Sequence, residues 1–503
     1  MNPDGLVEVD PVRQPCSMVF IGHVDAGKST ICGNLMYLNG IIDQRTIDKY
    51  KQEAVKSGRD SWWLAYVMDA CDEEREKGKT VEVGRAQFDT PSKKYTIFDA
   101  PGHKNYVPNM IMGAALADVG GLVISARKGE FEAGFEAQGQ TREHAQLAKS
   151  LGVQKLVVVV NKMDDCNWSK ARFEEIKTRL TPFLNATGYA DEDLIWVPIA
   201  GLTGANIVER CDGKTCNWYT GPTFMEILDQ VELEPRFPSG PLRIPVLDKM
   251  KDKDLIVHGK VENGTIRLGD KLAMMPYGSL AQVMHLLDGK NQVVKVAYPG
   301  ENVQIKINIA DEESLVRGNV FCHRDSMMPV TQMFIAEIDV LQLLEYKPII
   351  SKGYTCMMHI HTFNDEIVIQ EIDETITKVT KGADIVKKKP AFAASGQKMI
   401  CKIAPKNPLC LEKFETMAQL GRFTLRDEGQ TICVGKVLKY KPYQKGVVGA
   451  TGFVAAKTNN NSSEGGVTNS SGAEELVYDM DTGEMRPKAK ALDGIAEDEE
   501  EAE

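Results

Sequence analysis

The chain has 503 residues, 43% of them hydrophobic and 26% charged, an ordinary globular composition that is long enough for two to four domains. No stretch reaches the roughly 18 apolar residues of a membrane span, and the acidic, proline-containing N-terminus lacks the pattern of a signal peptide. The eleven cysteines show no paired zinc spacing, so reduced thiols of a cytoplasmic protein are expected.

The net charge of −11 is unevenly distributed along the chain. Residues 458–503 hold thirteen acidic and three basic side chains, so the rest of the chain carries a net charge of only −1. A nearly neutral body can still present a basic surface, so composition does not exclude binding to RNA. The polar, glycine-containing and acidic C-terminal sequence predicts a disordered tail over 443–503.

Residues 16–237, which follow a short N-terminal segment over 1–15, are predicted to form an α/β domain. Continuous apolar runs alternate there with helix-like stretches such as 141–149 and 171–184. Buried strands separated by helices are typical of a parallel sheet with helices on both faces. The apolar runs that predict these strands include 18–21, 95–98, 121–124 and 156–160.

The first apolar run leads directly into a phosphate-binding motif. Residues 22–29 match the pattern G-x-x-x-x-G-K-[ST], and a helix-like stretch follows, as such a loop requires. Glycines let backbone N–H groups close around phosphate oxygens, Lys28 supplies a positive charge, and Ser29 offers a hydroxyl to Mg²⁺. The nucleotide-binding residues predicted here are Gly22, His23, Val24, Asp25, Ala26, Gly27, Lys28, Ser29 and Thr30.

Two further segments are predicted to face the γ phosphate. Thr80 lies in a charged stretch, where its hydroxyl can bind Mg²⁺ and its N–H the phosphate. Asp99 follows the apolar run 95–98, and its carboxylate suits the surroundings of Mg²⁺. Gly102 can present its N–H to the γ phosphate and flip when that phosphate leaves. After a strand and a phosphate loop, this Asp-x-x-Gly pattern indicates a nucleotide-dependent switch.

The sequence Asn-Lys-Met-Asp at 161–164, which follows the most apolar run, predicts selection of guanine. Asp164 can accept hydrogen bonds from the N1–H and the exocyclic amine of guanine, whereas adenine offers no such pair of donors. The motif therefore favours GTP over ATP. The tight loop at 201–204 can offer backbone N–H groups to the guanine O6. The base-binding residues predicted are Asn161, Lys162, Asp164, Ala200, Gly201 and Leu202.

Residues 238–442 are predicted to form two β-barrels, over 238–328 and 329–442. Many short β-rich runs are broken there by Gly, Asn and Asp, as is typical of barrels. One such run, 256–266, contains an Asn-Gly pair and predicts two strands joined by a tight turn.

Three motifs together resemble the translational GTPase superfamily, especially its elongation factor one-alpha branch. They are Gly-His-Val-Asp-Ala-Gly-Lys-Ser-Thr from Gly22, Asp-Ala-Pro-Gly-His from Asp99, and Asn-Lys-Met-Asp from Asn161. The resemblance spans about residues 17–439. Within the branch, the segments that are similar to the eukaryotic class II release factors (release factor three) are 73–85, 125–132 and 421–429.

This resemblance implies a GTP-hydrolysing protein of the cytoplasm that binds GTP, GDP and Mg²⁺ and acts in translation termination. Its implied partners are a class I release factor and the ribosome. His103, directly after Asp-Ala-Pro-Gly, is implied as the catalytic residue, which orients the attacking water once the ribosome places it. Ser29 and Thr80 would hold Mg²⁺, and Asp25 would help to hold a monovalent cation near the phosphates.

The resemblance also implies a partner-binding surface within the segment 421–429. Residues four apart in a strand share a face, so Arg422 and Arg426 are expected to project outwards together. Phe423, between them, would anchor the strand inwards. Two arginines on one face suit an acidic segment of the class I factor. The residues expected at this surface are Arg422, Phe423 and Arg426.

Three features depart from the family pattern. Ala200 stands where release factor three carries a serine, so one side-chain brace of the guanine loop is absent. Typical members have a long N-terminal extension that binds poly(A)-binding protein, but here the phosphate loop begins at Gly22. The resemblance therefore gives no ground for expecting that partner. The acidic tail is the third departure.

Several alternatives remain open from sequence. An elongation factor and a ribosome-rescue GTPase share the superfamily, although Gly-Lys-Thr-Val-Glu-Val-Gly-Arg at 78–85 argues against both. The GTPase of sulfate activation shares the architecture and would need an adenylyltransferase partner. A scaffold that does not hydrolyse GTP is disfavoured by the intact Lys28, Thr80 and His103.

Overall fold

The computed structural model describes residues 13–56, 58, 62–68, 83–136, 139–251, 254–377 and 384–440, together with four short strands nearer the C-terminus. These strands form two pairs, β26 (Val447–Gly449) with β27 (Gly452–Val454) and β28 (Leu476–Tyr478) with β29 (Met485–Pro487). Thr80 lies outside the described residues. Apart from these four strands, so does the tail that was predicted over 443–503.

A six-stranded sheet forms the centre of the α/β domain. Its order is β2-β3-β1-β4-β5-β6, and neighbours are parallel except for β2, which is antiparallel to β3. Because β1 lies between β3 and β4, connections leave it in opposite directions, and ligands bind at such a point in open α/β sheets. The strands are β1 (Gln14–Gly22), β2 (Gly84–Asp89), β3 (Lys93–Asp99), β4 (Val119–Ser125), β5 (Lys155–Asn161) and β6 (Leu194–Pro198).

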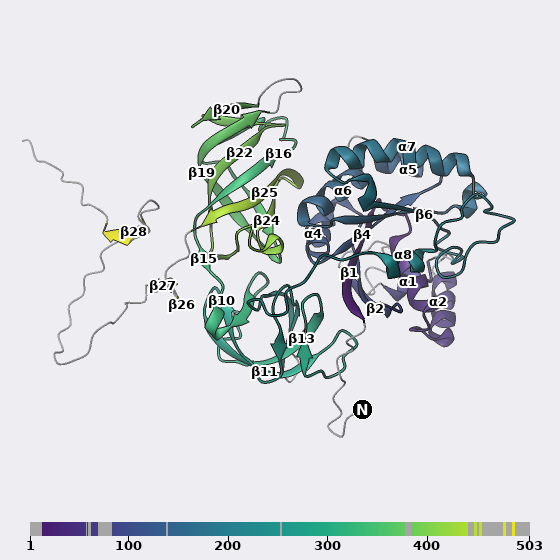
Figure 1. Cartoon of the computed structure of the whole chain (residues 1–503), viewed down its shortest axis with the longest axis horizontal. Coiled ribbons are helices and arrows are strands. Elements are labelled where there is room, and N and C mark those ends of the chain that lie inside the picture. The colour runs from purple at the N-terminus through teal and green to yellow at the C-terminus, as the bar shows by residue number, and fades with distance from the viewer. Residues whose placement is uncertain are drawn as a thin grey trace, which may run out of the picture.

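Helices cover both faces of this sheet because its central strands are apolar on both sides. Val19 and Ile21 of β1 pack in one core, and the alternate residues Met18 and Phe20 pack in a second core on the opposite face. The first core is closed by α4 (Val107–Ala115), α5 (Glu130–Phe135), α6 (Gln140–Leu151) and α7 (Lys170–Thr187). The second is closed by α1 (Lys28–Leu38) and α8 (Phe224–Gln230), and α2 (Gln44–Lys56) lies on the α1 side (Figure 1). This arrangement confirms the predicted α/β domain.

The first barrel is closed by six strands in the order β10-β11-β13-β8-β7-β14. Its interior holds buried aliphatic side chains such as Val257, Leu272 and Ile305. The strands are β7 (Ile244–Lys251), β8 (Leu255–Lys260), β10 (Lys271–Met275), β11 (Ser279–Leu287), β13 (Asn302–Ile309) and β14 (Val320–His323).

The tight hairpin predicted over 256–266 is wrong. After β8 the chain does not return along it, because β8 pairs with β7 and β13. The residues that follow instead form β9 (Ile266–Arg267), which pairs with β12 (Val296–Ala297). The Asn-Gly pair bends the chain against another segment: Asn263 forms an isolated bridge with Arg243, and a Cβ on Gly264 would lie 2.7 Å from the backbone of Leu242.

The second barrel closes because β18 pairs with both β24 and β19. Alternate residues of β16 point into its core, as the pattern of buried and half-buried residues in this strand shows. Together the two closed sheets confirm the prediction of two barrels. The strands are β16 (Phe334–Val340), β18 (Thr355–Ile360), β19 (Phe363–Thr377), β20 (Ile385–Lys388), β22 (Lys398–Pro405), β24 (Arg422–Asp427) and β25 (Gln430–Tyr440). Two short pairs, β15 (Val330–Thr331) with β23 (Leu409–Cys410) and β17 (Ile349–Ser351) with β21 (Phe392–Ala394), flank it.

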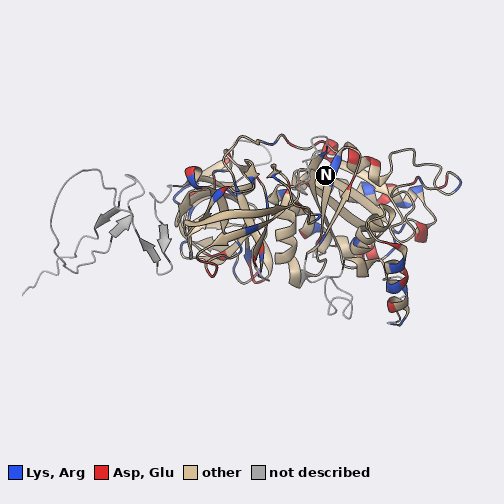
Figure 2. Ribbon diagram, turned by 90° about the horizontal axis from the view of Figure 1, so that it is seen from below, with Lys and Arg blue, Asp and Glu red and all other residues tan. Residues whose placement is uncertain are grey.

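The two barrels share a buried ion pair. Arg243 precedes the first barrel and contacts Glu412 of the second at 3.0 Å, with both side chains about nine-tenths buried or more. The hydroxyl of Tyr440 donates to the other oxygen of Glu412 at 3.0 Å. Figure 2 shows acidic and basic residues interspersed over the α/β domain and both barrels.

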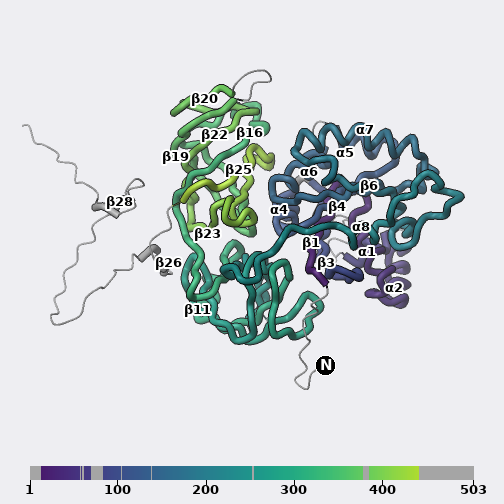
Figure 3. Tube along the Cα trace, in the orientation of Figure 1, coloured from purple at the N-terminus to yellow at the C-terminus, as the bar shows by residue number. Residues whose placement is uncertain are grey.

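A second charge network, in which Lys260 is buried and Asp118 and Arg236 are half-buried, joins the first barrel to the α/β domain. Asp118, just before β4, accepts hydrogen bonds from Lys260 of β8 at 3.0 Å and from Arg236 at 2.8 Å. Arg236 belongs to the segment that runs from α8 to the first barrel (Figure 3). Although burial alone would raise it, Lys260 and Arg236 hold the pKa of Asp118 below its ordinary value. Burial raises the pKa of the neighbouring Glu262.

The second barrel lies beside α4 and α6 (Figure 1), with Glu143 of α6 paired to Arg426 of β24. None of the helices among the described residues has the length and hydrophobicity needed to span a membrane.

Candidate nucleotide site

A cavity of about 450 Å³ lies at the edge of the sheet where the parallel strands end. Thirteen of the residues predicted from sequence line it: Val24, Asp25, Gly27, Lys28, Ser29, Thr30, Gly102, His103, Asn161, Lys162, Asp164, Gly201 and Leu202. Gly22, His23, Ala26, Asp99 and Ala200 are not among the lining residues, and Thr80 is outside the described residues. The structure thus brings together segments that are up to about 180 residues apart in sequence.

The phosphate loop needs glycine for two physical reasons. Its backbone has positive φ at Gly22 and Gly27, a region that favours glycine. A Cβ on Gly27 would lie 2.3 Å from Nδ2 of Asn161, so any side chain there would displace the loop. Helix α1 starts at Lys28, and its N-terminus therefore directs N–H groups and positive potential at the cavity.

Lys28 lies inside this loop and is almost fully buried. Its ammonium donates hydrogen bonds to the carbonyls of His23 at 2.8 Å and Gly22 at 3.2 Å. Burial lowers the pKa of Lys28, while the nearby carboxylate of Asp99 opposes that shift. The loop therefore holds a cation at the cavity wall, and phosphate oxygens are suitable partners for it.

The segment after β3 places Gly102 against the phosphate loop. A Cβ on Gly102 would lie 2.6 Å from the ammonium of Lys28 and 3.0 Å from the amide nitrogen of Val24. A side chain here would displace the ammonium of Lys28 and press on the amide of Val24, so glycine is favoured at this position. Asp99, at the end of β3, is fully buried beneath this contact.

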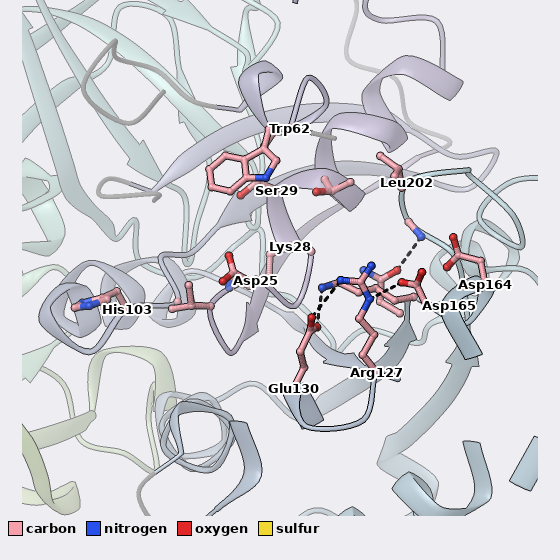
Figure 4. Close-up of a pocket in the computed structure, with 18 residues that line it drawn as sticks. Asp25, Lys28, Ser29, Trp62, His103, Arg127, Glu130, Asp164, Asp165 and Leu202 are labelled. Carbon is pink, nitrogen blue, oxygen red and sulfur yellow. Dashed lines mark hydrogen bonds and ion pairs between the residues drawn. The ribbon is translucent and has the colours of Figure 1, made fainter. Parts of the chain in front are cut away.

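His103 is half-buried at one edge of the cavity, at the opposite end from Asp164 (Figure 4). Its Nδ1 accepts a hydrogen bond from the amide of Asn105 at 3.3 Å, which caps the short helix η2 (Lys104–Tyr106). Its ring lies 5.9 Å from that of Tyr106. His103 is thus held by its own segment and not by the phosphate loop.

Asn161 organises the end of the cavity that lies near Asp164. Its Nδ2 donates to the carbonyl of Ala26 at 2.8 Å, and its Oδ1 accepts from the amide of Gly201 at 2.8 Å. This buried amide therefore ties the phosphate loop to the guanine loop, which sequence did not reveal. Asp164 makes no salt bridge with any described residue, and its carboxylate faces the cavity (Figure 4).

Three charged residues of the lining were not predicted. Glu130 holds the ammonium of Lys162 at 2.7 Å, and Arg127 holds Asp165 at 2.6 Å. Although burial opposes it, hydrogen bonds from Lys162 and Ser125 lower the pKa of Glu130. Figure 4 shows this cluster next to Asp164. The segment 125–132 resembles release factor three in sequence, but the resemblance did not assign a role in the nucleotide site to these side chains. Trp62 and Ala65 also line the cavity without having been predicted.

Asn34 of α1 is a further brace that the sequence did not reveal. Its Nδ2 donates to the carbonyl of Gly201 at 2.7 Å, and the side chain is 3% exposed. Ala200, which lacks the serine hydroxyl of the family pattern, is fully buried beside this contact. The guanine loop is therefore fixed at both backbone groups of Gly201, by Asn161 at the amide and by Asn34 at the carbonyl.

Replacing Asn34 with alanine should weaken guanine nucleotide binding about tenfold. The change leaves a buried carbonyl unpaired, which costs about 1–3 kcal/mol, and releases the loop that faces the base. Titration with a fluorescent GDP analogue measures this. Asn39→Ala is the matched control, because Asn39 donates a similar bond of 2.7 Å to Leu35 at the far end of the same helix. An equal loss in both variants would mean that helix stability, not loop geometry, is affected.

The structure corrects the expected partner surface on β24. Phe423 is in the core of the second barrel, as predicted, and fully buried. Arg422 and Arg426 do share the other face, but that face lies against the α/β domain. Arg426 is 4% exposed and paired with Glu143, and Arg422 abuts Gly152 just after α6. The expectation that both arginines project outwards is wrong, because α6 packs on them.

Comparisons with known proteins agree with this site and fold. Residues 14–236 match the "Elongation factor Tu GTP binding domain" family, and residues 334–438 match the family "GTP-eEF1A C-terminal domain-like". The chain is 47% identical over 427 residues to the "Eukaryotic peptide chain release factor GTP-binding subunit" of Kluyveromyces lactis, a match that covers 84% of this chain and 60% of that protein. The protein of the same description from Candida albicans is 47% identical over 425 residues, with 84% and 59% covered.

The chain therefore spans about 60% of the length of these curated relatives. The Ski7 GTPase-like domain of S. cerevisiae, solved with GDP and inorganic phosphate, has a TM-score of 0.69 to this structure. That likeness covers 84% of this chain and 97% of the Ski7 chain at 18% identity, and it shows a common fold alone. By its domains, its motifs and its sequence identity to these relatives, the chain belongs to the translational GTPases, in the branch of the eukaryotic peptide chain release factor GTP-binding subunits.

Proposed function

We propose that this protein is a GTP hydrolase of translation termination in the cytoplasm, which acts with a class I release factor on the ribosome at stop codons and promotes peptide release. The observation that carries the proposal is the cavity itself. It joins a phosphate loop and the carboxylate of Asp164, which selects guanine, to a histidine at the phosphate end. The name of the relatives supports termination over elongation or ribosome rescue.

The residues of the site have distinct roles in this proposal. Asp164 accepts hydrogen bonds from guanine, while the amides of the phosphate loop and Lys28 bind the phosphates. His103 orients the attacking water once the ribosome places it. Catalysis of phosphoryl transfer consists mostly of positioning and charge stabilisation. Because His103 is held away from the phosphate loop until the ribosome moves it, GTP hydrolysis by the protein alone should be slow.

The residues present fit a Mg²⁺ ion. Ser29 offers a hydroxyl in the cavity wall, and the buried carboxylate of Asp99 lies near Lys28 below it. Mg²⁺ prefers oxygen ligands and usually keeps several waters and phosphate oxygens, so it needs few protein ligands. Bound there, the ion would neutralise charge on the phosphates. Thr80 would be a further ligand, and Asp25 would help to hold a monovalent cation.

Hydrolysis of GTP measured with ribosomes tests this function. Turnover should rise by roughly 10² or more only when ribosomes and a class I release factor are both present, the scale of a completed water-positioning site. Aminoacyl-tRNA in place of the class I factor is the matched control and should give no such rise. Stimulation by aminoacyl-tRNA, or by an adenylyltransferase, would assign the chain to another member of this architecture.

A further inference from the structure

The segment between β6 and α8 brings two cysteines together. Cys211 and Cys216 flank a tight turn, in which the amides of Thr215 and Cys216 both donate to the carbonyl of Asp212, at 2.9 and 3.0 Å. The carboxylate of Asp212 accepts a hydrogen bond from the amide of Lys214 at 3.1 Å and braces the turn. The thiol groups of the two cysteines contact each other and are not joined by a disulfide. The turn thus holds two thiols side by side, and the nucleotide site uses neither of them.

The two thiols differ in their access to solvent. Among the ten cysteines that the structure describes, eight are buried, and only Cys166 and Cys211 are half-buried. Cys216 is 3% exposed and packs in the core beneath the turn. Burial, together with the adjacent thiol of Cys211, raises the pKa of Cys216 to about 12, so this sulfur keeps its proton at neutral pH. Many redox-sensitive pairs consist of an accessible thiol that is oxidised first and a neighbouring thiol that completes the disulfide.

The same segment is hydrogen-bonded to the guanine motif. Trp218, two residues after Cys216, donates from its Nε1 to the carbonyl of Trp168 at 2.6 Å. The amide of Trp168 donates in turn to the carbonyl of Met163 at 2.8 Å, and Met163 directly precedes Asp164. Cys216, Trp168 and Met163 also belong to one buried core. A shift of the turn at Cys216 therefore reaches the segment that carries Asp164.

We propose that Cys211 and Cys216 form a redox pair, which a hydroperoxide closes to a disulfide and a dithiol reductant reopens, and that closure weakens the hold on guanine. The effect on guanine rests on the proposed nucleotide binding, whereas formation of the disulfide does not. With separate thiols, the hydrogen bond between Trp218 and Trp168 is made. A covalent bond brings the two sulfurs closer than a contact between thiols allows, so the turn that carries Cys216 must move and weaken this hydrogen bond. Disulfides of cytoplasmic proteins are mostly transient, and catalytic or redox-sensing.

The oxidation balances in two steps. The thiolate of Cys211 attacks one oxygen of hydrogen peroxide: an S–O bond forms, the O–O bond breaks, and the released hydroxide takes up the proton that the thiol lost. The sulfur of Cys216 then attacks the sulfenic acid: an S–S bond forms, the S–O bond breaks, and the hydroxide leaves as water with the proton of Cys216. In total the two thiols lose two electrons and two protons, and the peroxide becomes two molecules of water.

Peptide mapping tests the disulfide directly, because Lys214 lies between the two cysteines. Trypsin places Cys211 in the peptide 211–214 and Cys216 in the peptide 215–236. The full chain is treated with hydrogen peroxide, and the remaining thiols are blocked before digestion. The two peptides should then be found as one linked species, which a dithiol reductant separates. Recovery of Cys211 as a sulfinic or sulfonic acid without a linked species, or linkage of Cys216 to another cysteine, would overturn the redox pair.

The matched control is the other half-buried thiol. Cys166 donates a hydrogen bond from its sulfur to the carbonyl of Ala126 at 3.2 Å. Cys166→Ser should therefore leave the linked species intact. Cys211→Ser should leave Cys216 unlinked and recovered as a blocked thiol, because the buried sulfur is not oxidised first. Oxidation of Cys216 to the same extent without Cys211 would contradict the assigned order of the two steps.

The rate of GDP release tests the effect on guanine. Oxidation of the parent should speed release of a fluorescent GDP analogue about fivefold, the lower end of typical coupling between sites, and the dithiol reductant should restore the rate. Cys166→Ser should respond as the parent does, whereas peroxide-treated Cys211→Ser should release the analogue at the rate of the reduced parent. If the parent binds no guanine nucleotide, the proposed function fails while the disulfide stands. If the linked species forms and the release rate does not change, the action on guanine is overturned.

Discussion

Replacing His103 with alanine should lower ribosome-stimulated GTP hydrolysis by roughly 10² or more, the effect of losing a group that positions water or stabilises charge. Nucleotide affinity should hardly change, because His103 lies at the edge of the cavity and hydrogen-bonds its own segment and not the phosphate loop. Single-turnover hydrolysis on ribosomes measures the first quantity, and titration with a fluorescent GTP analogue the second.

The control for this prediction addresses the capping role of the imidazole. His103→Asn keeps a side-chain oxygen that can accept from the amide of Asn105, as asparagine does at helix N-termini. If that variant hydrolyses GTP as slowly as His103→Ala, the loss of activity comes from the missing imidazole in catalysis and not from the missing helix cap. Hydrolysis within about a factor of two of the parent in both variants would make His103 a structural cap.

Replacing Asp164 with asparagine should lower GDP affinity by roughly 10² or more and shift preference towards xanthine nucleotides. The amide offers a donor where the carboxylate accepted, and xanthine carries an oxygen where guanine carries an amine. Competition between GDP and XDP for the fluorescent analogue measures the change. Asp165→Asn is the matched control, since its carboxylate is held by Arg127 at 2.6 Å. A variant of Asp164 that keeps its guanine preference would contradict the assignment.

The features that the sequence predicted correctly are local motifs, whose residues lie close together along the chain. Lys28 and Ser29 stand in a loop whose glycines, strand and helix all lie within the same short segment, so local chemistry predicts their position. Asp164 lies three residues after the last residue of the buried strand β5, which places it at the carboxyl edge of the sheet. Parallel strands bring such loops together without further information.

What sequence missed depends on contacts between distant segments. Asn34 reads as an ordinary polar residue of a helix, and only the folded structure puts it 2.7 Å from the carbonyl of Gly201. Arg426 was placed correctly on the face opposite Phe423, because strand alternation decides that. The element that packs on this face is α6, which lies about 280 residues earlier in the chain. Only the docking of the second barrel on the α/β domain creates this contact, so strand alternation could not predict it. The Asn-Gly turn failed for the same reason, since the partner of β9 is β12.

The charge network around Asp118 limits how this protein can be recombined with its relatives. Asp118 comes from the α/β domain, Arg236 from the connecting segment and Lys260 from the first barrel. Exchanging the barrel alone, with a neutral residue at position 260, would leave the half-buried carboxylate of Asp118 with one of its two cations and would destabilise the contact between the barrel and the α/β domain. A chimaera must therefore carry the three residues as one set, so the unit that can be inherited or swapped is larger than the barrel.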